Sequence, residues 1–266
     1  MQENVGEHFP FEQHLLISLT TLRFVDVVDF MANMAVFNVT DLNTLGCLLQ
    51  RAGTSFSETS SVSNYLTSVL PCIRRLDITL RLPLPICKAL EYPEANSSPG
   101  SPPASALTAS WASQLTAWLH LCPAIAQLKE LQRLQIWLDH DDPLSWSIIN
   151  ERAILSPLAP LTNIPHFNFS INLPKLHPGL ERLDRHFGED SPAPTFKIQR
   201  RLRQSYHSKE TSECHFRVSY EADFPLLLGC PSFENTPLAE IEVMERSLWK
   251  RGVNVEELLS DTFICY

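Results

Sequence analysis

The sequence predicts an α/β fold in which helix–strand units stack side by side on a mostly parallel sheet, as an irregular, leucine-rich-repeat-like architecture. Three segments repeat one spacing of apolar residues, and a helical pattern precedes each of them. The chain has 266 residues, of which 44% are hydrophobic, so it can bury a sizeable core. The alternative is a compact α/β sandwich. In either case we expect a single domain over 1–266.

The repeated spacing places apolar residues at positions x, x+3, x+5 and x+7. It occurs three times, as Ile73, Leu76, Ile78 and Leu80, as Leu131, Leu134, Ile136 and Leu138, and as Ile164, Phe167, Phe169 and Ile171. The last three residues of each set alternate, so they share one face of a strand. Arg75 and Arg133 also occupy the same place in the first two segments. We therefore expect three neighbouring strands with their apolar sides facing helices.

Helical patterns precede these strands at 60–70, 104–122 and 146–161. In the second pattern, apolar residues recur at three- and four-residue steps from Leu107 to Cys122, and Pro123 ends the helix. Strands separated by helices favour parallel pairing, since a parallel pair needs a long crossover connection. Each unit would then bury its apolar face against the next unit.

The two ends of the chain continue the pattern. Residues 34–53 predict a strand and then a helix, which Asp41 caps. The segment 214–220 alternates as a late strand, and 235–254 predicts a helix that Gly252 ends. Two polar stretches interrupt the apolar pattern. We expect 91–105, rich in proline and serine, to be a flexible loop, and 186–212 to be a polar insertion.

Composition excludes several classes of function. The formal net charge is -9, which disfavours binding to nucleic acid or to an anionic membrane surface. No apolar run approaches the roughly 20 residues of a membrane-spanning helix, and the N-terminus lacks the pattern of a secretory signal. Seven cysteines without a CxxC pair indicate reduced thiols, so we expect a cytoplasmic or nuclear protein. No P-loop or GxGxxG motif is present, and we expect no cofactor.

An acidic quartet, Asp139–Asp142 with His140, directly follows the second predicted strand. Asp139, His140 and Asp141 are candidate metal ligands, because carboxylate and imidazole groups bind divalent ions. The competing interpretation is a solvated strand exit that caps the next helix, with Pro143 fixing the turn. Adjacent residues on an extended chain point in opposite directions, which favours this second interpretation.

A basic cluster lies in 197–209. Lys197, Arg200, Arg201 and Arg203 are candidate contacts for an acidic partner, or part of a nuclear-import signal. The competing interpretation is a solvated helix face.

Four stretches carry a resemblance to a fungal family of unknown function. They are AVFNVTDLNTLGCLL (35–49), LPCIRRLDITL (70–80), LQRLQIWL (131–138) and EVMERSLWKRGVNVEELL (242–259). The order of these pieces resembles the family over residues 30–175 and the C-terminal helix. Some members carry an F-box-like segment, but its opening LPxEIR-type helices are absent here. The resemblance implies a fungal protein and supplies no catalytic residues.

The leading functional hypothesis is a non-enzymatic interaction or scaffold protein that binds another protein. Its binding surface would be the exposed strand face or the loops at the strand ends. The alternative is an enzyme or accessory protein of fungal metabolism, with a pocket near Asp139–Asp142. An enclosed cavity with converging polar groups would favour the enzyme, and an open sheet would favour the binding protein.

Overall fold

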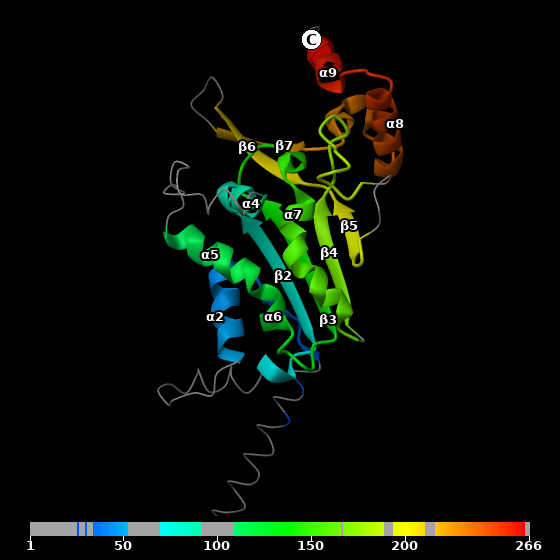
Figure 1. Cartoon of the computed structure of the whole chain (residues 1–266). Coiled ribbons are helices and arrows are strands. Elements are labelled where there is room, and N and C mark those ends of the chain that lie inside the picture. The colour runs from blue at the N-terminus through cyan, green and yellow to red at the C-terminus, as the bar shows by residue number, and fades with distance from the viewer. Residues whose placement is uncertain are drawn as a thin grey trace, which may run out of the picture.

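Five parallel strands form one sheet in the order of the sequence, β1-β2-β3-β4-β5 (Figure 1). The computed structural model describes residues 34–52, 70–91, 109–165, 167–188, 194–210 and 216–263, together with Asp26 and Phe30. The strands are β1 (Phe37–Val39), β2 (Arg75–Leu82), β3 (Arg133–His140), β4 (Asn168–Pro174) and β5 (Lys197–Arg201). Each strand lies beside the next one in the chain, as in a stack of helix–strand units.

Helices between the strands cover one face of this sheet (Figure 1). They are α2 (Leu42–Ala52), α4 (Leu84–Glu91), α5 (Ala109–Leu119), α6 (Leu121–Ile125) and α7 (Glu151–Leu155), with the 3-10 turns η1 (Leu70–Cys72), η3 (Trp146–Ile148) and η4 (Ser156–Asn163). Leu45 of α2, Ile86 of α4, Trp118 of α5 and Ile154 of α7 share one buried cluster with Ile136 of β3. The α/β class is confirmed. Coverage of one face favours the stacked architecture over the compact sandwich.

The register of the sheet aligns apolar side chains in rows across the strands. Leu76 of β2 pairs with Leu134 of β3, and Leu134 pairs with Phe169 of β4. The spacing of apolar residues had placed Phe167 opposite Leu134, so the prediction for β4 was shifted by two residues. A shift of two keeps every side chain on its own face, because the side-chain period of a strand is two. The inward face was therefore predicted correctly even though the register was not.

The predicted helix cap at Asp41, helix end at Gly252 and late strand are all present in the structure. The side chain of Asp41 accepts a hydrogen bond from the backbone N–H of Thr44 at 2.7 Å, which caps α2. Helix α8 (Leu238–Lys250) ends before Gly252, whose φ of 79° is the left-handed conformation that glycine adopts easily. The late strand 214–220 corresponds to β7 (Phe216–Ala222).

The last part of the described chain lies beyond the carboxyl ends of the sheet strands (Figure 1). It comprises the antiparallel hairpin of β6 (Gln204–Glu210) and β7, the turns η5 (Leu226–Gly229) and η6 (Pro231–Phe233), and the helices α8 and α9 (Val255–Phe263). Leu227, Ile241 and Val255 form a second, smaller core there. An ion pair between Arg246 of α8 and Glu181, at 3.1 Å, joins this part to the segment after β4.

Two predicted segments need correction or lie outside the described residues. The stretch 186–212 is not an insertion, because it contains β5, the fifth strand of the sheet, and β6. Most of the predicted loop at 91–105 and of the predicted helix at 60–70 lies outside the described residues. Among the helices that are described, none combines the length and the apolar character needed to cross a bilayer.

Two neighbouring residues of β3 test which face of the sheet is buried. Ile136 is 0% exposed, whereas Gln135 points to the other face and is partly exposed. We expect Ile136→Ala to lower the free energy of unfolding by about 2–5 kcal/mol, since it leaves a cavity in the core. Gln135→Ala should change it by no more than about 0.5 kcal/mol. Urea denaturation measures both, and equal losses would contradict the assignment of faces.

Candidate functional site

The face of the sheet opposite the helices is open among the described residues. We call "the open face" the side chains that point this way from β2 to β5. They are Arg75, Asp77, Thr79, Arg81, Arg133, Gln135, Trp137, Asp139, Asn168, Ser170, Asn172, Pro174, Lys197, Gln199 and Arg201. All of them except Asp139, Asn172 and Pro174 are exposed or partly exposed. A surface built on strands is rigid, which suits it to present side chains in fixed positions.

Trp137 stands near the middle of the open face. The register places it in one row with Thr79 of β2, Asn172 of β4 and Gln199 of β5. Trp137 is partly exposed, whereas Trp118 and Trp146 are buried in the core. Exposed tryptophan is costly in water and is enriched at the centres of protein–protein interfaces.

Amide side chains hold two arginines of the open face in place. Arg201 donates from Nε to the side-chain oxygen of Asn172 at 3.1 Å, and from Nη2 to that of Gln199 at 2.6 Å. Arg133 donates to the side-chain oxygen of Gln135 at 2.8 Å. These amides are neutral, so the guanidinium groups keep their positive charge uncompensated.

At the carboxyl end of β3 the predicted acidic quartet surrounds an arginine. Arg203, which is 5% exposed, donates from Nε to Asp139 Oδ1 at 2.8 Å. The same guanidinium donates to the backbone oxygens of His140 at 3.2 Å and Asp142 at 2.7 Å, and to that of Leu144. Asp223 Oδ2 lies 3.9 Å away. The cation beside Asp139 is therefore the Arg203 guanidinium, in the place where the sequence had suggested a metal ion.

The other members of the quartet have separate structural roles. Asp141 accepts from the backbone N–H of Leu84 at 3.2 Å, and so caps α4, the helix that follows β2 and not the helix that follows β3. Asp142 accepts from the backbone N–H of Leu144 at 3.0 Å and fixes the turn at Pro143. In the described part of the chain, no three histidine, cysteine, aspartate or glutamate side chains converge as a metal site would require.

His140 is held in its neutral form by its neighbours. Arg203 Nη2 lies 3.4 Å from His140 Nδ1 and can only donate, so Nδ1 accepts. The other nitrogen, Nε2, lies 3.4 Å from the backbone oxygen of Ser145 and carries the proton. Burial, and then the Arg203 charge, lower the pKa of His140. The ring stacks on Trp146 with 5.9 Å between centroids.

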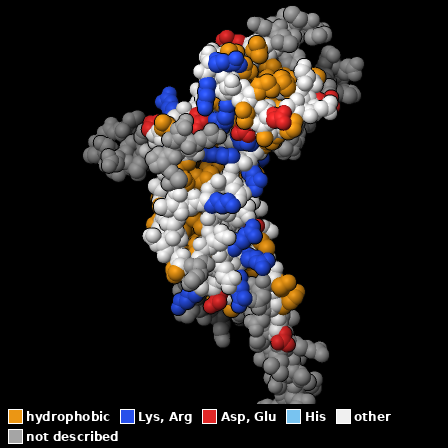
Figure 2. All heavy atoms as spheres, turned by 90° about the vertical axis from the view of Figure 1, so that its right-hand side faces the viewer, with side chains coloured by type: hydrophobic (Ala, Val, Ile, Leu, Met, Phe, Trp, Pro, Cys, Tyr) orange, Lys and Arg blue, Asp and Glu red, His pale blue; other side chains and the backbone are white. Residues whose placement is uncertain are grey.

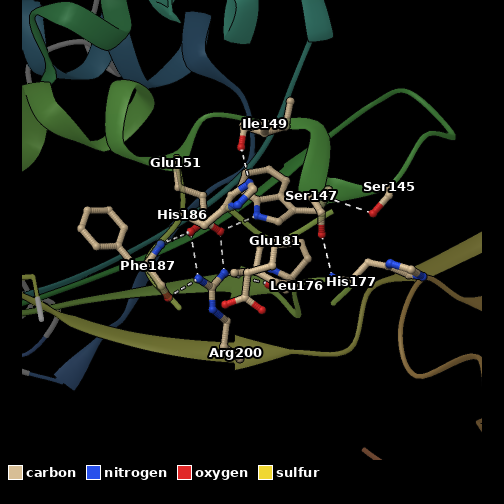
Figure 3. Close-up of polar contacts among 12 residues, drawn as sticks. Ser145, Ser147, Ile149, Glu151, Leu176, His177, Glu181, His186, Phe187 and Arg200 are labelled. Carbon is tan, nitrogen blue, oxygen red and sulfur yellow. Dashed lines mark hydrogen bonds and ion pairs between the residues drawn. The ribbon is translucent and has the colours of Figure 1, made fainter. Parts of the chain in front are cut away.

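A second buried ion pair lies under the sheet edge. Glu151, the first residue of α7, is 0% exposed. Arg200 of β5 donates to its two oxygens at 2.5 and 2.8 Å (Figure 3). The indole N–H of Trp146 donates to Glu151 at 2.7 Å, and the backbone N–H of Phe187 donates at 3.0 Å. Four donors therefore satisfy one carboxylate, and the pair ties β5 to α7.

Two histidines close to this ion pair are also structural (Figure 3). His186 is 0% exposed, accepts at Nδ1 from the backbone N–H of Arg182 at 2.8 Å, and donates from Nε2 to Ile149 O at 2.9 Å. Burial lowers the pKa of His186. The backbone N–H of His177 donates to Ser147 Oγ at 2.7 Å, and its ring packs on Trp249 with 4.8 Å between centroids. His177 Nδ1 accepts from the backbone N–H of Gly179 at 3.2 Å, and its Nε2 is buried without a hydrogen bond to the described residues, 3.8 Å from Glu256 Oε1.

The predicted basic cluster divides between two environments. Lys197, Gln199 and Arg201 point to the open face, whereas Ile198 and Arg200 point to the helices. Arg200 and Arg203 are engaged in the internal ion pairs with Glu151 and Asp139. Of the four predicted partner contacts, Lys197 and Arg201 are thus exposed and stay a prediction, whereas Arg200 and Arg203 are held by internal ion pairs. The competing interpretation as a helix face is also wrong, because residues 197–201 form a strand, and KIQRR, with Ile198 as its one apolar residue, has no alternation that could have indicated it.

Cys87 of α4, near the carboxyl end of β2, is not suited to act as a nucleophile. Burial, with a smaller effect of the Asp141 carboxylate, raises the pKa of this thiol to about 12. It is therefore a protonated thiol at neutral pH and a poor nucleophile.

An open depression of about 720 Å³ lies on the helical side, lined by residues of α2 and α5 such as Gly46, Cys47 and Ala117. Its lining contains no carboxylate.

Fold and site together define a class: a parallel α/β stack whose helices cover one face, with an open, polar second face. No protein-family model, curated protein or solved structure matches the chain. The resemblance to a fungal family therefore stays a prediction. Trp137 and Gln135 were not among the predicted site residues, although their places between alternating apolar residues indicate an outward direction.

Arg203 and Arg201 form a matched pair for testing the internal ion pair. Arg203→Ala leaves the buried Asp139 carboxylate without its cation, which should lower the free energy of unfolding by about 3–5 kcal/mol. Arg201→Ala removes an exposed guanidinium and should cost less than about 1 kcal/mol. Chemical denaturation of both variants measures the difference. Equal stability of the two variants would show that Arg203 does not compensate Asp139.

The pKa values of His140 and His186, lowered in the folded chain, predict the pH dependence of stability. Below an ordinary imidazole pKa of about 6.5, the unfolded chain binds protons that the folded chain does not. The contribution of the two neutral histidines to the free energy of unfolding should therefore be fully present above about pH 6.5. It should decrease as the pH falls towards the pKa values of the folded chain, by up to about 1.4 kcal/mol per pH unit for each histidine. Denaturation at a series of pH values measures this slope. His186→Gln should reduce it, whereas His120→Gln, at an exposed position, should leave it unchanged.

Proposed function

We propose that this chain is a non-enzymatic interaction protein that binds another protein through the open face of its sheet. One observation carries the proposal: the partly exposed Trp137 stands among polar and basic side chains on a rigid sheet face that the described helices leave uncovered. An aromatic anchor inside a polar rim is the arrangement found at protein–protein hot spots.

The contacts at the strand ends favour this proposal over an enzyme with a pocket near Asp139–Asp142. Asp139, Asp141 and Asp142 each accept a hydrogen bond at Oδ1, from Arg203, Leu84 and Leu144, so one oxygen of each carboxylate is engaged in holding the fold. The neutral His140 lies between Arg203 and the Ser145 carbonyl. A catalytic cluster needs groups that are free to meet a substrate.

The open face also fits a scaffold role mechanically. Its side chains come from four strands that are joined by main-chain hydrogen bonds, and the ion pairs of Arg200 and Arg203 fix the ends of those strands. A partner would therefore meet a preorganised surface and would not have to order it on binding. We place this activity in the cytoplasm or nucleus of a fungal cell, following the sequence-based prediction.

Site-specific photocrosslinking tests the proposal. A benzophenone amino acid at Thr79, an exposed neighbour of Trp137 in the register, should crosslink a partner in an extract of the organism that encodes the chain. The same amino acid at Ser110, exposed on α5, serves as the control and should give only background. Trp137→Ala in the Thr79-labelled protein should remove most of the crosslink, because the anchor is lost. Equal yields at Thr79 and Ser110 would contradict the proposal.

A further inference from the structure

The charges of the open face point to the chemistry of the partner. Resting on the proposed function, we propose that the open face binds an extended acidic polypeptide segment, with an apolar side chain of that segment against Trp137. Five cations point from this face, namely Arg75, Arg81, Arg133, Lys197 and Arg201. Its carboxylates among the described residues are Asp77 and Asp139, and Asp139 is 8% exposed and already pairs with Arg203. The surface is thus basic, although the formal net charge of the chain is -9.

These five cations differ from the other arginines around the sheet in their ion pairing. At the carboxyl ends of the strands, Arg185 pairs with Glu91 at 2.7 Å and Arg246 with Glu181 at 3.1 Å, in addition to the buried pairs of Arg200 and Arg203. On the open face, none of the five cations forms an ion pair with a carboxylate of the described residues. Figure 2, which views the molecule from the right-hand side of Figure 1, shows basic side chains along the whole length of that side and most of the acidic ones towards its upper end. An acidic segment would supply the missing partners.

Two polar atoms on the open face also have unused hydrogen-bonding capacity. Asn172 Nδ2 and Asp77 Oδ1 are buried and make no hydrogen bond to the part of the chain that is described. Asn172 lies in the row of Trp137, and its amide oxygen already accepts from Arg201. Its free N–H group can donate to a carboxylate or to a peptide carbonyl. A buried polar group is costly unless it is paired, but Asn172 is 0% exposed, so a bound peptide would pair it only after a neighbouring side chain moved aside.

The size of the open face favours an extended segment over a globular partner. From β2 to β5 it is about 15 Å wide, and from Arg75 to Arg81 it is about 20 Å long, using ordinary strand spacing and rise. The resulting area of roughly 300 Å² is well below the roughly 800 Å² per partner of a standard interface. About six extended residues span 20 Å, so one short peptide can reach from Arg133 past Trp137 to Arg81 or Arg201.

A single-stranded nucleic acid is the other anion that an exposed tryptophan could hold. Such binding surfaces usually present several aromatic rings for successive bases. Trp137 is the one aromatic side chain of the open face in the described residues. The negative charge of the whole chain would also repel a long polyanion more than a short acidic peptide. The observations therefore favour the polypeptide.

Fluorescence anisotropy with defined probes tests the inference. The probe is a labelled peptide of about ten aspartates and glutamates with one central leucine, and its control replaces every acid by asparagine or glutamine. A single-stranded oligouridylate of about ten nucleotides tests the nucleic acid. We expect the full chain to bind the acidic peptide, more weakly at about 300 mM than at about 50 mM salt because ions screen exposed charges. Binding of the control peptide should be at least about tenfold weaker.

Charge reversal on and off the open face assigns the site. The variant Arg133→Glu/Arg201→Glu should weaken binding of the acidic peptide by about tenfold or more. The matched variant Lys88→Glu/Lys250→Glu changes the same charge at exposed positions on α4 and α8 and should retain the affinity within about twofold. Circular dichroism and urea midpoints establish that both variants fold, and Arg133→Gln/Arg201→Gln serves if the first variant does not.

Three outcomes would overturn the inference: equal binding of the acidic and amide peptides, equal effects of the two charge reversals, or tighter binding of the oligouridylate. The proposed function fails separately. If the Thr79 crosslink captures a partner while the acidic peptide does not bind, the open face is a binding surface for a protein of different chemistry. If neither occurs, both ideas fail.

Discussion

Parallel pairing of β2, β3 and β4 in one register is the constraint on which the other features of this chain depend. It places Ile78, Ile136 and Ile171 in one row against the helices, and by the same alternation it sends Thr79, Trp137 and Asn172 to the other side. A slip by one residue would exchange the two faces. Burial of the apolar row therefore determines where every polar side chain of the open face stands.

Ion pairs then fix the ends of the strands where apolar packing stops. Arg200 lies in β5 and pairs with the buried carboxylate of Glu151 in α7. Arg203, two residues after the end of β5, pairs with the buried carboxylate of Asp139 in β3. Buried pairs contribute little net stability, because removing charges from water is costly. The two pairs instead fix the positions of the elements they join. One pair joins β5 to α7, and the other joins the end of β3 to the chain that follows β5. The basic residues of 197–203 thus serve both the interior and the surface.

Much of the fold could be predicted from the sequence, because period-two alternation and helix-ending residues are local signals. The strands β2 and β3, the cap at Asp41 and the end of α8 at Gly252 are of this kind. The register of β4 was missed by two residues, since Phe167 and Phe169 both satisfy the apolar spacing and only the pairing with Leu134 distinguishes them. The partners of Arg200 and Arg203 could not be predicted, because Glu151 and Asp139 lie far away in the sequence. For the candidate site, Lys197 and Arg201 were found by their charge, whereas Trp137 was noticed only through the structure.

Hydroxyl-radical footprinting of the full chain tests the central claim most directly, namely that one face of the sheet is open in solution. Trp118 and Trp146 are 0% and 1% exposed and serve as internal references for a buried indole. The account predicts that Trp137 is oxidised much faster than either of them, as judged by mass spectrometry of its peptide. Protection of Trp137 to the level of Trp118 and Trp146 would show that the face is covered, and would contradict the account.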